Sequence, residues 1–213
     1  MYENTLTPAA KKLFPHLARF RTYYLVGGTS LALQIGHRVS VDFDMFTSER
    51  LPSNLYSSIK RIFKYPVSLT YRSPEQLNVL VANVKMTFFS FPYSTIYPLI
   101  TYRGVKLASV KEIASMKAFA IGKRLAYKDY VDWYFLLKDK HVILPEVIVD
   151  AEKKFGTDFN SRLFLGQLAS FADVPTQQID FLKKKISRHA IELYLESAVR
   201  DVVKQKHAAR LHT

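Results

Sequence analysis

The stretch LVGGTSL (residues 25–31), together with SVDFDMF (residues 40–46) shortly after it, decides the fold of this chain. Residues 23–26, which lead into the glycines, are aromatic, aliphatic and β-branched, and this composition predicts a buried strand. Gly27 and Gly28 then allow the backbone to turn sharply and to approach a ligand closely. We therefore expect a strand, a tight turn, a short helix and a second strand, in that order.

The hydroxyl residues Thr29 and Ser30 follow the glycines and are expected to cap a helix over residues 31–35. The first turn of a helix presents unpaired N–H groups and the positive end of the helix dipole, which together suit a phosphate group. Residues 27–30 are therefore predicted to bind the phosphates of a nucleotide.

Two acids, Asp42 and Asp44, lie two residues apart in the second predicted strand. In a strand this spacing directs both carboxylates to one face and turns Val41, Phe43 and Met45 toward the core. Two carboxylates on one face repel each other unless a cation lies between them, and oxygen ligands of this kind suit Mg²⁺ with substrate phosphates and water. The alternative is a glycine turn in an ordinary α/β domain, with two solvent-facing acids on an edge strand.

The composition limits the classes of protein to consider. The 213 residues suffice for one large domain or two small ones, and no apolar run reaches the roughly 18 residues of a membrane span. The N-terminus lacks the pattern of a signal peptide, and the absence of cysteine excludes disulfides and thiolate metal sites, as fits a cytoplasmic protein. A net charge of +13 favours an anionic partner, most simply a nucleic acid, although an acidic protein partner would also fit.

The remaining pattern divides the chain into two parts. A first helix is expected from Thr7 to Phe20, and a charged turn at His37 and Arg38 precedes the acidic strand. The other expected elements of the first part are a helix over 52–63 and strands over 67–71, 78–82, 84–91 and 102–107. Helices are then expected over 109–126, 127–137, 145–155, 159–171, 176–187 and 189–206. We therefore predict an α/β domain over residues 1–104 and a helical domain over residues 105–213.

The helical part contains a second group of charged residues. Ser109 and Glu112 have the spacing of a capping box at the start of a helix. Lys117 and Arg124 project from nearly the same face of that helix, two turns apart. Lys128, Asp129 and Asp132 begin the next helix, where acids favour the helix dipole. On spacing alone these charges can form a salt-bridge network that docks two helices together.

Two of these stretches resemble a known family. The pattern LVGGTSLAL (residues 25–33) followed by HRxSxDxDxF (residues 37–46) is similar to the first motif of the AbiEii/AbiGii-type nucleotidyl transferase toxins, which belong to the DNA polymerase β-like superfamily. Lys117, Arg124 and the KDxxD pattern of residues 128–132 resemble a later motif of that family. The resemblance implies an α+β fold, with a polymerase β-like mixed sheet and flanking helices, followed by an all-helical half that closes the cleft.

The resemblance also implies roles for individual residues. Asp42 and Asp44 would hold Mg²⁺, Gly27, Gly28, Thr29 and Ser30 would bind the triphosphate, and Lys117 would hold phosphates as a point charge. Arg38, Arg124 and Lys128 would assist in nucleotide binding, or Arg38 could belong to a solvated turn. Asp129 and Asp132 could orient the nucleotide, act as a base or lock the helices together.

One position departs from the family pattern. A third acid of the polymerase β-like fold is expected on the strand over residues 84–91, and the matching residue here is Thr87. A threonine is a weak neutral ligand, so this departure bears on two-metal chemistry more than on nucleotide binding.

The resemblance implies a toxin of a toxin–antitoxin or phage-defence pair that transfers an NMP from an NTP. The basic surface favours tRNA as the acceptor over a protein hydroxyl, and a cognate antitoxin is an implied partner. The alternative is a non-catalytic, antitoxin-like module that binds nucleotide or a partner.

Overall fold

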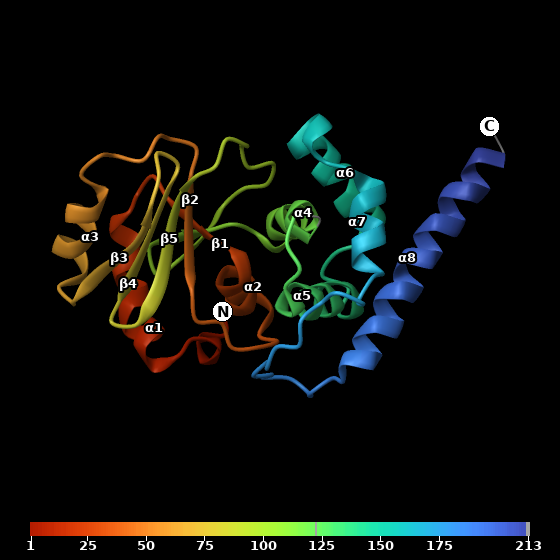
Figure 1. Cartoon of the computed structure of the whole chain (residues 1–213), viewed down its shortest axis with the longest axis horizontal. Helices are drawn as coiled ribbons and strands as arrows, with labels where there is room; N and C mark the ends of the chain where they lie inside the picture. The colour runs from red at the N-terminus through yellow and green to blue at the C-terminus, as the bar shows by residue number, and fades with distance from the viewer. Residues whose placement is uncertain (122, 212–213) are drawn as a thin grey trace. The chain divides into compact units, whose positions relative to one another are not determined.

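The computed structural model describes residues 1–121 and 123–211, with side chains up to residue 205, and Figure 1 shows the order of its elements. The chain forms two compact units. The first comprises Met1–Ser109 and Asp180–Lys183, and the second comprises Val110–Ile179 and Lys184–Thr213. The architecture is α+β, as the sequence predicts, with a mixed sheet and helices in the first unit and helices in the second.

The described residues of the first unit form a seven-stranded sheet in the order β3-β4-β5-β2-β1-β7-β6. Strand β5 runs parallel to β2 and strand β7 parallel to β1, whereas the other neighbouring pairs are antiparallel. The strands are β1 (Tyr24–Val26), β2 (Phe43–Thr47), β3 (Val67–Arg72), β4 (Gln76–Val81), β5 (Val84–Ser90), β6 (Ile100–Tyr102) and β7 (Val105–Leu107).

The sheet agrees with the predicted strands except at its far end. The tight turn between β4 and β5 is made by Ala82 and Asn83, both with positive φ, as in a two-residue hairpin. The single strand expected over residues 102–107 is instead the hairpin of β6 and β7, because Arg103 and Gly104 also adopt positive φ and reverse the chain. The predicted domain boundary after Gly104 falls inside this hairpin.

Helices of the first unit cover one face of the sheet and form its core. They are η1 (Glu3–Thr5), α1 (Pro8–Leu13), η2 (Phe14–Arg19), α2 (Gly27–Ile35) and α3 (Leu55–Phe63). The ring of Phe14 lies 6.2 Å from that of Phe43, and the ring of Phe20 lies 4.9 Å from that of Phe88. These contacts join η2 and the residue after it to the buried faces of β2 and β5, so Asp44 and Thr87 lie on the opposite face of these strands.

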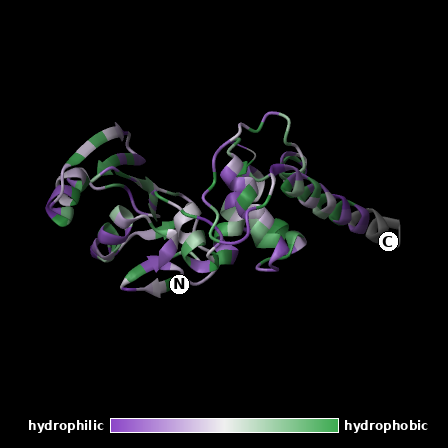
Figure 2. Cartoon of the chain, turned by 90° about the horizontal axis from the view of Figure 1, so that it is seen from below, coloured by the Kyte–Doolittle hydropathy of each residue, from purple (hydrophilic) through white to green (hydrophobic). Residues whose placement is uncertain are grey.

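The second unit consists of α4 (Val110–Ile121), α5 (Tyr127–Lys138), α6 (Leu144–Phe155), η3 (Gly156–Asp158), α7 (Ser161–Leu168) and α8 (Arg188–Leu211). Helix α8 is amphipathic: hydrophilic and hydrophobic residues alternate along it in Figure 2, and Ile191 and Leu195 are fully buried. Among the residues that the structure describes, no helix is both long and apolar enough to traverse a lipid bilayer.

The helix predicted over residues 176–187 is wrong. This segment has no helical turns, and its middle residues pair with the first unit. The N–H of Val39 donates to the Asp180 carbonyl over 2.9 Å, and the N–H of Leu182 donates to the His37 carbonyl over 3.0 Å. The segment satisfies its backbone through these long-range bonds, which override a helical spacing of apolar residues.

Candidate active site

The acidic strand lies where the sequence predicts it, with one correction. Phe43 and Met45 are fully buried in the core, and Asp44 is half-buried on the opposite face of β2. Asp42 is also half-buried and directly precedes β2. Val41 was expected to face the core but is 47% exposed, because the regular alternation of the strand begins only at Phe43.

Strand β5 lies beside this acidic strand. The parallel register of β2 and β5 places Thr87 directly opposite Asp44, and the antiparallel register of β4 and β5 places Asn78 opposite Thr87. The position at which a third acid was expected is therefore adjacent to Asp44 in space, and a threonine occupies it.

The glycine turn lies against the same strand. Gly27 has a φ of +69°, and a Cβ built at this position would collide with the carboxylate of Asp44. Backbone strain and lack of space therefore both require glycine at this position. Helix α2 begins at Gly27 rather than at residue 31, so its first turn touches the acidic strand.

The prediction that Thr29 and Ser30 cap the helix is wrong. Helix α2 begins two residues before Thr29, and neither hydroxyl makes a capping bond. The Thr29 hydroxyl donates instead to the backbone carbonyl of Asp42, and it lies 2.8 Å from the Ser40 hydroxyl. The Ser30 hydroxyl donates to the Ala108 carbonyl over 3.2 Å. These bonds fix the first turn of α2 against the acidic strand and against the residue that follows β7.

Arg38 is buried beside the same turn. Its Nη1 donates to the Val39 carbonyl over 3.0 Å, and its Nη2 lies 2.7 Å from the place where a Cβ of Gly28 would be. Only 4% of Arg38 is exposed, so it does not belong to a solvated turn. The first unit thus brings together Gly27, Gly28, Thr29, Arg38, Ser40, Asp42 and Asp44; of these, sequence reasoning missed Ser40, whose two-residue spacing from Asp42 was the available signal.

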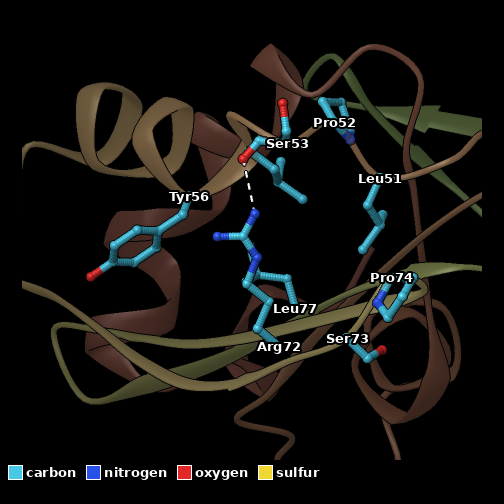
Figure 3. Close-up of a pocket in the computed structure, with 9 residues that line it drawn as sticks. Leu51, Pro52, Ser53, Tyr56, Arg72, Ser73, Pro74 and Leu77 are labelled. Atoms are coloured by element: carbon cyan, nitrogen blue, oxygen red, sulfur yellow. Dashed lines mark hydrogen bonds between the residues drawn. The ribbon is translucent and has the colours of Figure 1, made fainter.

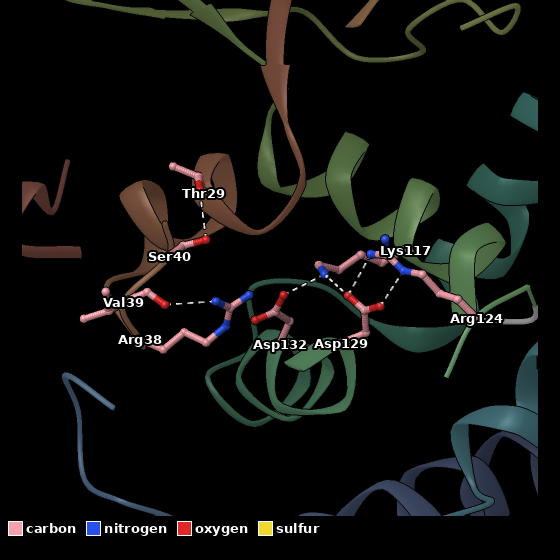
Figure 4. A network of polar contacts seen from close by, with 8 residues as sticks. All are labelled: Thr29, Arg38, Val39, Ser40, Lys117, Arg124, Asp129 and Asp132. Atoms are coloured by element: carbon pink, nitrogen blue, oxygen red, sulfur yellow. Dashed lines mark hydrogen bonds and ion pairs between the residues drawn. The ribbon is translucent and has the colours of Figure 1, made fainter. Parts of the chain in front are cut away.

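The second unit contains the predicted charge network. Lys117 Nζ in α4 lies 2.7 Å from Asp129 Oδ1 and 2.6 Å from Asp132 Oδ2, both in α5, and Figure 4 shows it between the two carboxylates. These three side chains are at most 5% exposed. Arg124 adds a bond from Nε to Asp129 Oδ2 over 3.0 Å, although its side chain is 58% exposed. Lys128 is half-buried and lies outside the network.

The charges of this network determine the ionisation of Asp129. Burial by itself would raise the pKa of Asp129, but the Lys117 ammonium and the Arg124 guanidinium outweigh burial and hold this pKa below its usual value of 3.8. Asp129 is therefore an acceptor at neutral pH, and it orients Lys117.

A second buried ion pair anchors α4, the helix that carries Lys117. The Lys154 ammonium in α6 lies 2.7 Å from the Glu112 carboxylate, and both side chains are fully buried. Glu112 is the residue that the sequence assigns to a capping box with Ser109. Its carboxylate also pairs with a residue 42 positions later in the sequence, which no local spacing could indicate.

A cavity of about 380 Å³ lies elsewhere in the first unit, between α3 and the turn that joins β3 to β4. Figure 3 shows Arg72 at its centre, where Nη2 donates to the Ser53 carbonyl over 3.1 Å. Leu77 lines this cavity from the core face of β4, whereas Asp44 and Thr87 lie on the opposite face of the sheet. The cavity is therefore separate from the candidate site.

No protein-family model matches the sequence. The protein aq_aa25 of Aquifex aeolicus, itself uncharacterised, is 35% identical over 159 residues, which cover 71% of this chain and 74% of the relative. The chain belongs to the aq_aa25 family. This relationship establishes kinship without assigning an activity.

Solved structures share the fold of this chain. A candidate nucleotidyltransferase from Helicobacter pylori matches 93% of this chain and 95% of its own, with a TM-score of 0.57 and 16% identity. JHP933 from Helicobacter pylori matches 97% of this chain and 98% of its own, again with a TM-score of 0.57 and 16% identity. MenT4, a nucleotidyltransferase toxin from Mycobacterium tuberculosis, matches 91% and 84%, with a TM-score of 0.55 and 12% identity. The predicted nucleotidyltransferase fold is thereby confirmed.

Proposed function

We propose that this chain is a nucleotidyltransferase that moves an NMP from an NTP to an acceptor and releases pyrophosphate. The observation that carries the proposal is the contact between the glycine turn and the acidic strand: the Asp44 carboxylate occupies the space that a Cβ at Gly27 would need. The start of α2, which suits an anion, thus lies against the acidic strand, as transfer from a polyphosphate would require.

The acids fit a magnesium ion. Two carboxylates supply the hard oxygen ligands that Mg²⁺ prefers, and water and substrate phosphates complete its usual coordination. Among the side chains that the structure describes, those of residues 1–121 and 123–205, no group of three or more His, Cys, Asp or Glu is arranged to share an ion. Asp42 and Asp44 would therefore hold the ion with substrate oxygens, and the ion would offset the charge that develops on the phosphates.

The residues of the first unit then have distinct roles in binding. The N–H groups at the start of α2, with Gly28 and Thr29 in the first turn, would bind the β- and γ-phosphates. Arg38 lies beside that turn and would add positive charge there. Ser30 would act by fixing the turn, because its hydroxyl is bonded to Ala108. The α-phosphate would lie at Asp42 and Asp44, where an acceptor hydroxyl or phosphate attacks and pyrophosphate leaves.

In the second unit, Lys117 is the proposed phosphate-binding cation, and Asp129 and Asp132 would hold its ammonium in place. Arg124 follows the end of α4 and Lys128 lies at the start of α5, and both would assist in nucleotide binding. Lys117 would have to exchange part of its carboxylate contacts for phosphate contacts when the nucleotide binds.

The acceptor and the biological role are also proposed. The net charge of +13 supports tRNA as the acceptor in preference to a protein hydroxyl. The fold shared with the toxin MenT4 and the AbiEii/AbiGii-like motifs support a cytoplasmic toxin with a cognate antitoxin.

The test is label transfer from each of the four α-³²P-labelled NTPs, with Mg²⁺ and bulk tRNA. We expect label in RNA for at least one NTP, a loss of about 100-fold or more in the Asp42→Asn and Asp44→Asn variants, and no change in Glu49→Gln, which alters an exposed acid after the same strand. Transfer at the wild-type rate by either aspartate variant would refute the assignment.

The second candidate is a non-catalytic binding module, which Thr87 opposite Asp44 favours because the third acid is absent. NTP binding that depends on Asp44, without pyrophosphate release in the presence of tRNA or of co-expressed proteins, would support the module. Label on a co-expressed protein would instead identify a protein hydroxyl as the acceptor.

A further inference from the structure

Two phenylalanines lie on the same sheet face as Asp44. Phe46 follows Asp44 by two residues in β2, and Phe89 follows Thr87 by two residues in β5. The register pairs Phe46 with Phe89, and their ring centroids are 5.1 Å apart. Both rings are half-buried, whereas Phe43 and Phe88, which point to the other face, are fully buried.

The face therefore carries two parallel rows of side chains. Asp44, Thr87 and Asn78 form the first row, and Phe46, Phe89 and Gln76 form the second. The rows are about 6.6 Å apart, two residues along the strands. A polar row for phosphates is thus followed directly by an aromatic row, within one rigid sheet.

The aromatic row is supported by Phe91 beside its two rings and by a hydrogen bond at its Gln76 end. The ring of Phe91 lies 5.1 Å from that of Phe46 and 6.1 Å from that of Phe89, which holds both rings in fixed orientations. At the other end, the Gln76 amide donates to Asn78 Oδ1 over 2.9 Å, and this bond fixes a side-chain amide beside Phe89.

We propose that Phe46 and Phe89 form the platform on which the base of the bound NTP stacks, with the Gln76 amide placed to bind the edge of that base. The inference rests on the proposed function, because it takes the α-phosphate to lie at Asp42 and Asp44. One sugar separates the base of a nucleotide from its α-phosphate, which matches one step between the rows. Aromatic rings stack on any base, and a side-chain amide distinguishes bases by its hydrogen bonds.

The test compares two probes that differ by the nucleoside: magnesium complexes of the four NTPs and of inorganic tripolyphosphate. The variants are Phe46→Leu and Phe89→Leu, which keep an apolar side chain but remove the ring. Phe63→Leu is the matched control, because it makes the same change in the core, where Phe63 is 1% exposed. Binding is measured by calorimetry, and folding of each variant is checked by its melting temperature.

We expect each ring variant to lose about tenfold in NTP affinity while tripolyphosphate affinity stays unchanged, and Phe63→Leu to bind both probes as the wild type does. Gln76→Ala should change the order of affinities among the four NTPs. If both ring variants bind NTP with wild-type affinity while Asp44→Asn loses affinity for both NTP and tripolyphosphate, the platform is overturned and the proposed function stays intact. A wild-type protein that binds neither probe would overturn both.

Discussion

Removing the buried cation of the second unit should destabilise that unit severely. Lys117→Met keeps an unbranched apolar stem of similar length but removes the ammonium that lies 2.7 Å from Asp129 and 2.6 Å from Asp132. Asp132 is fully buried, and Asp129 would retain only the largely exposed Arg124 as its partner in the network. The variant therefore removes the cation that lies between two buried carboxylates.

The expected cost follows from this burial. Breaking a buried ion pair by removing one partner costs about 4 kcal/mol. In a unit of this size, each kcal/mol lowers the melting temperature by roughly 5 °C, so we expect the second unit of Lys117→Met to melt roughly 20 °C below the wild type. Calorimetry and far-ultraviolet circular dichroism measure this shift.

A matched variant separates the charge from the packing. Adding Asp129→Asn and Asp132→Asn to Lys117→Met removes the buried charges together, and most of the lost stability should return. This triple variant should fold but should not transfer nucleotide, if Lys117 holds phosphate. A Lys117→Met protein that melts within about 2 °C of the wild type would refute the assignment of a buried, charged network.

Three further changes test other parts of the account. Because the pKa of Asp129 is lowered in the folded protein, its contribution to stability is fully present above its unfolded pKa near 3.8 and is lost as the pH falls through the folded pKa. Urea unfolding between pH 7 and pH 2.5 should show this loss. An Asp129→Asn variant with the same acid-dependent loss would contradict the prediction. Thr87→Asp places a carboxylate opposite Asp44, so without metal the free energy of unfolding of the variant should be about 0.5 to 1 kcal/mol lower than that of the wild type. Added Mg²⁺ should stabilise the variant more than the wild type, and equal responses to Mg²⁺ would show that no ion binds there. Gly27→Ala should cost more stability than Gly156→Ala, because both glycines have positive φ but only a Cβ at Gly27 would collide with the Asp44 carboxylate. Only Gly27→Ala should also lose NTP binding. Equal losses of stability in calorimetry would exclude the collision with Asp44.

The sequence predicts the central part of the first unit well, because the signals there are local. Alternation along β2 predicts which of its faces is buried, and the burial of Phe43 and Met45 confirms it. The family resemblance assigns Thr87 to the position of a third acid near Asp42 and Asp44, and the strand register places Thr87 opposite Asp44.

The errors lie where tertiary contacts outweigh local preference. Thr29 has the chemistry of a cap, but the helix begins at Gly27 and the hydroxyl binds the Asp42 carbonyl instead. Residues 176–187 have helical spacing, yet Asp180 and Leu182 hydrogen-bond to the first unit.

The candidate site was predicted in outline rather than in detail. The residue types around Asp42 and Asp44 indicate the chemistry, but the contact between Arg38 and Gly28 depends on a turn that local patterns do not specify. The Lys154–Glu112 pair links α6 to α4, and it could not be predicted because charged residues at helix surfaces have many partners of equal spacing.

The most direct test is a crystal structure of the protein with Mn²⁺ and a non-hydrolysable NTP analogue, with anomalous diffraction to locate the ion. The account predicts an anomalous peak within ligand distance of the Asp42 and Asp44 carboxylates, with the β- and γ-phosphates on the N–H groups at the start of α2. A triphosphate bound elsewhere, or an ion that contacts neither aspartate, would contradict the account.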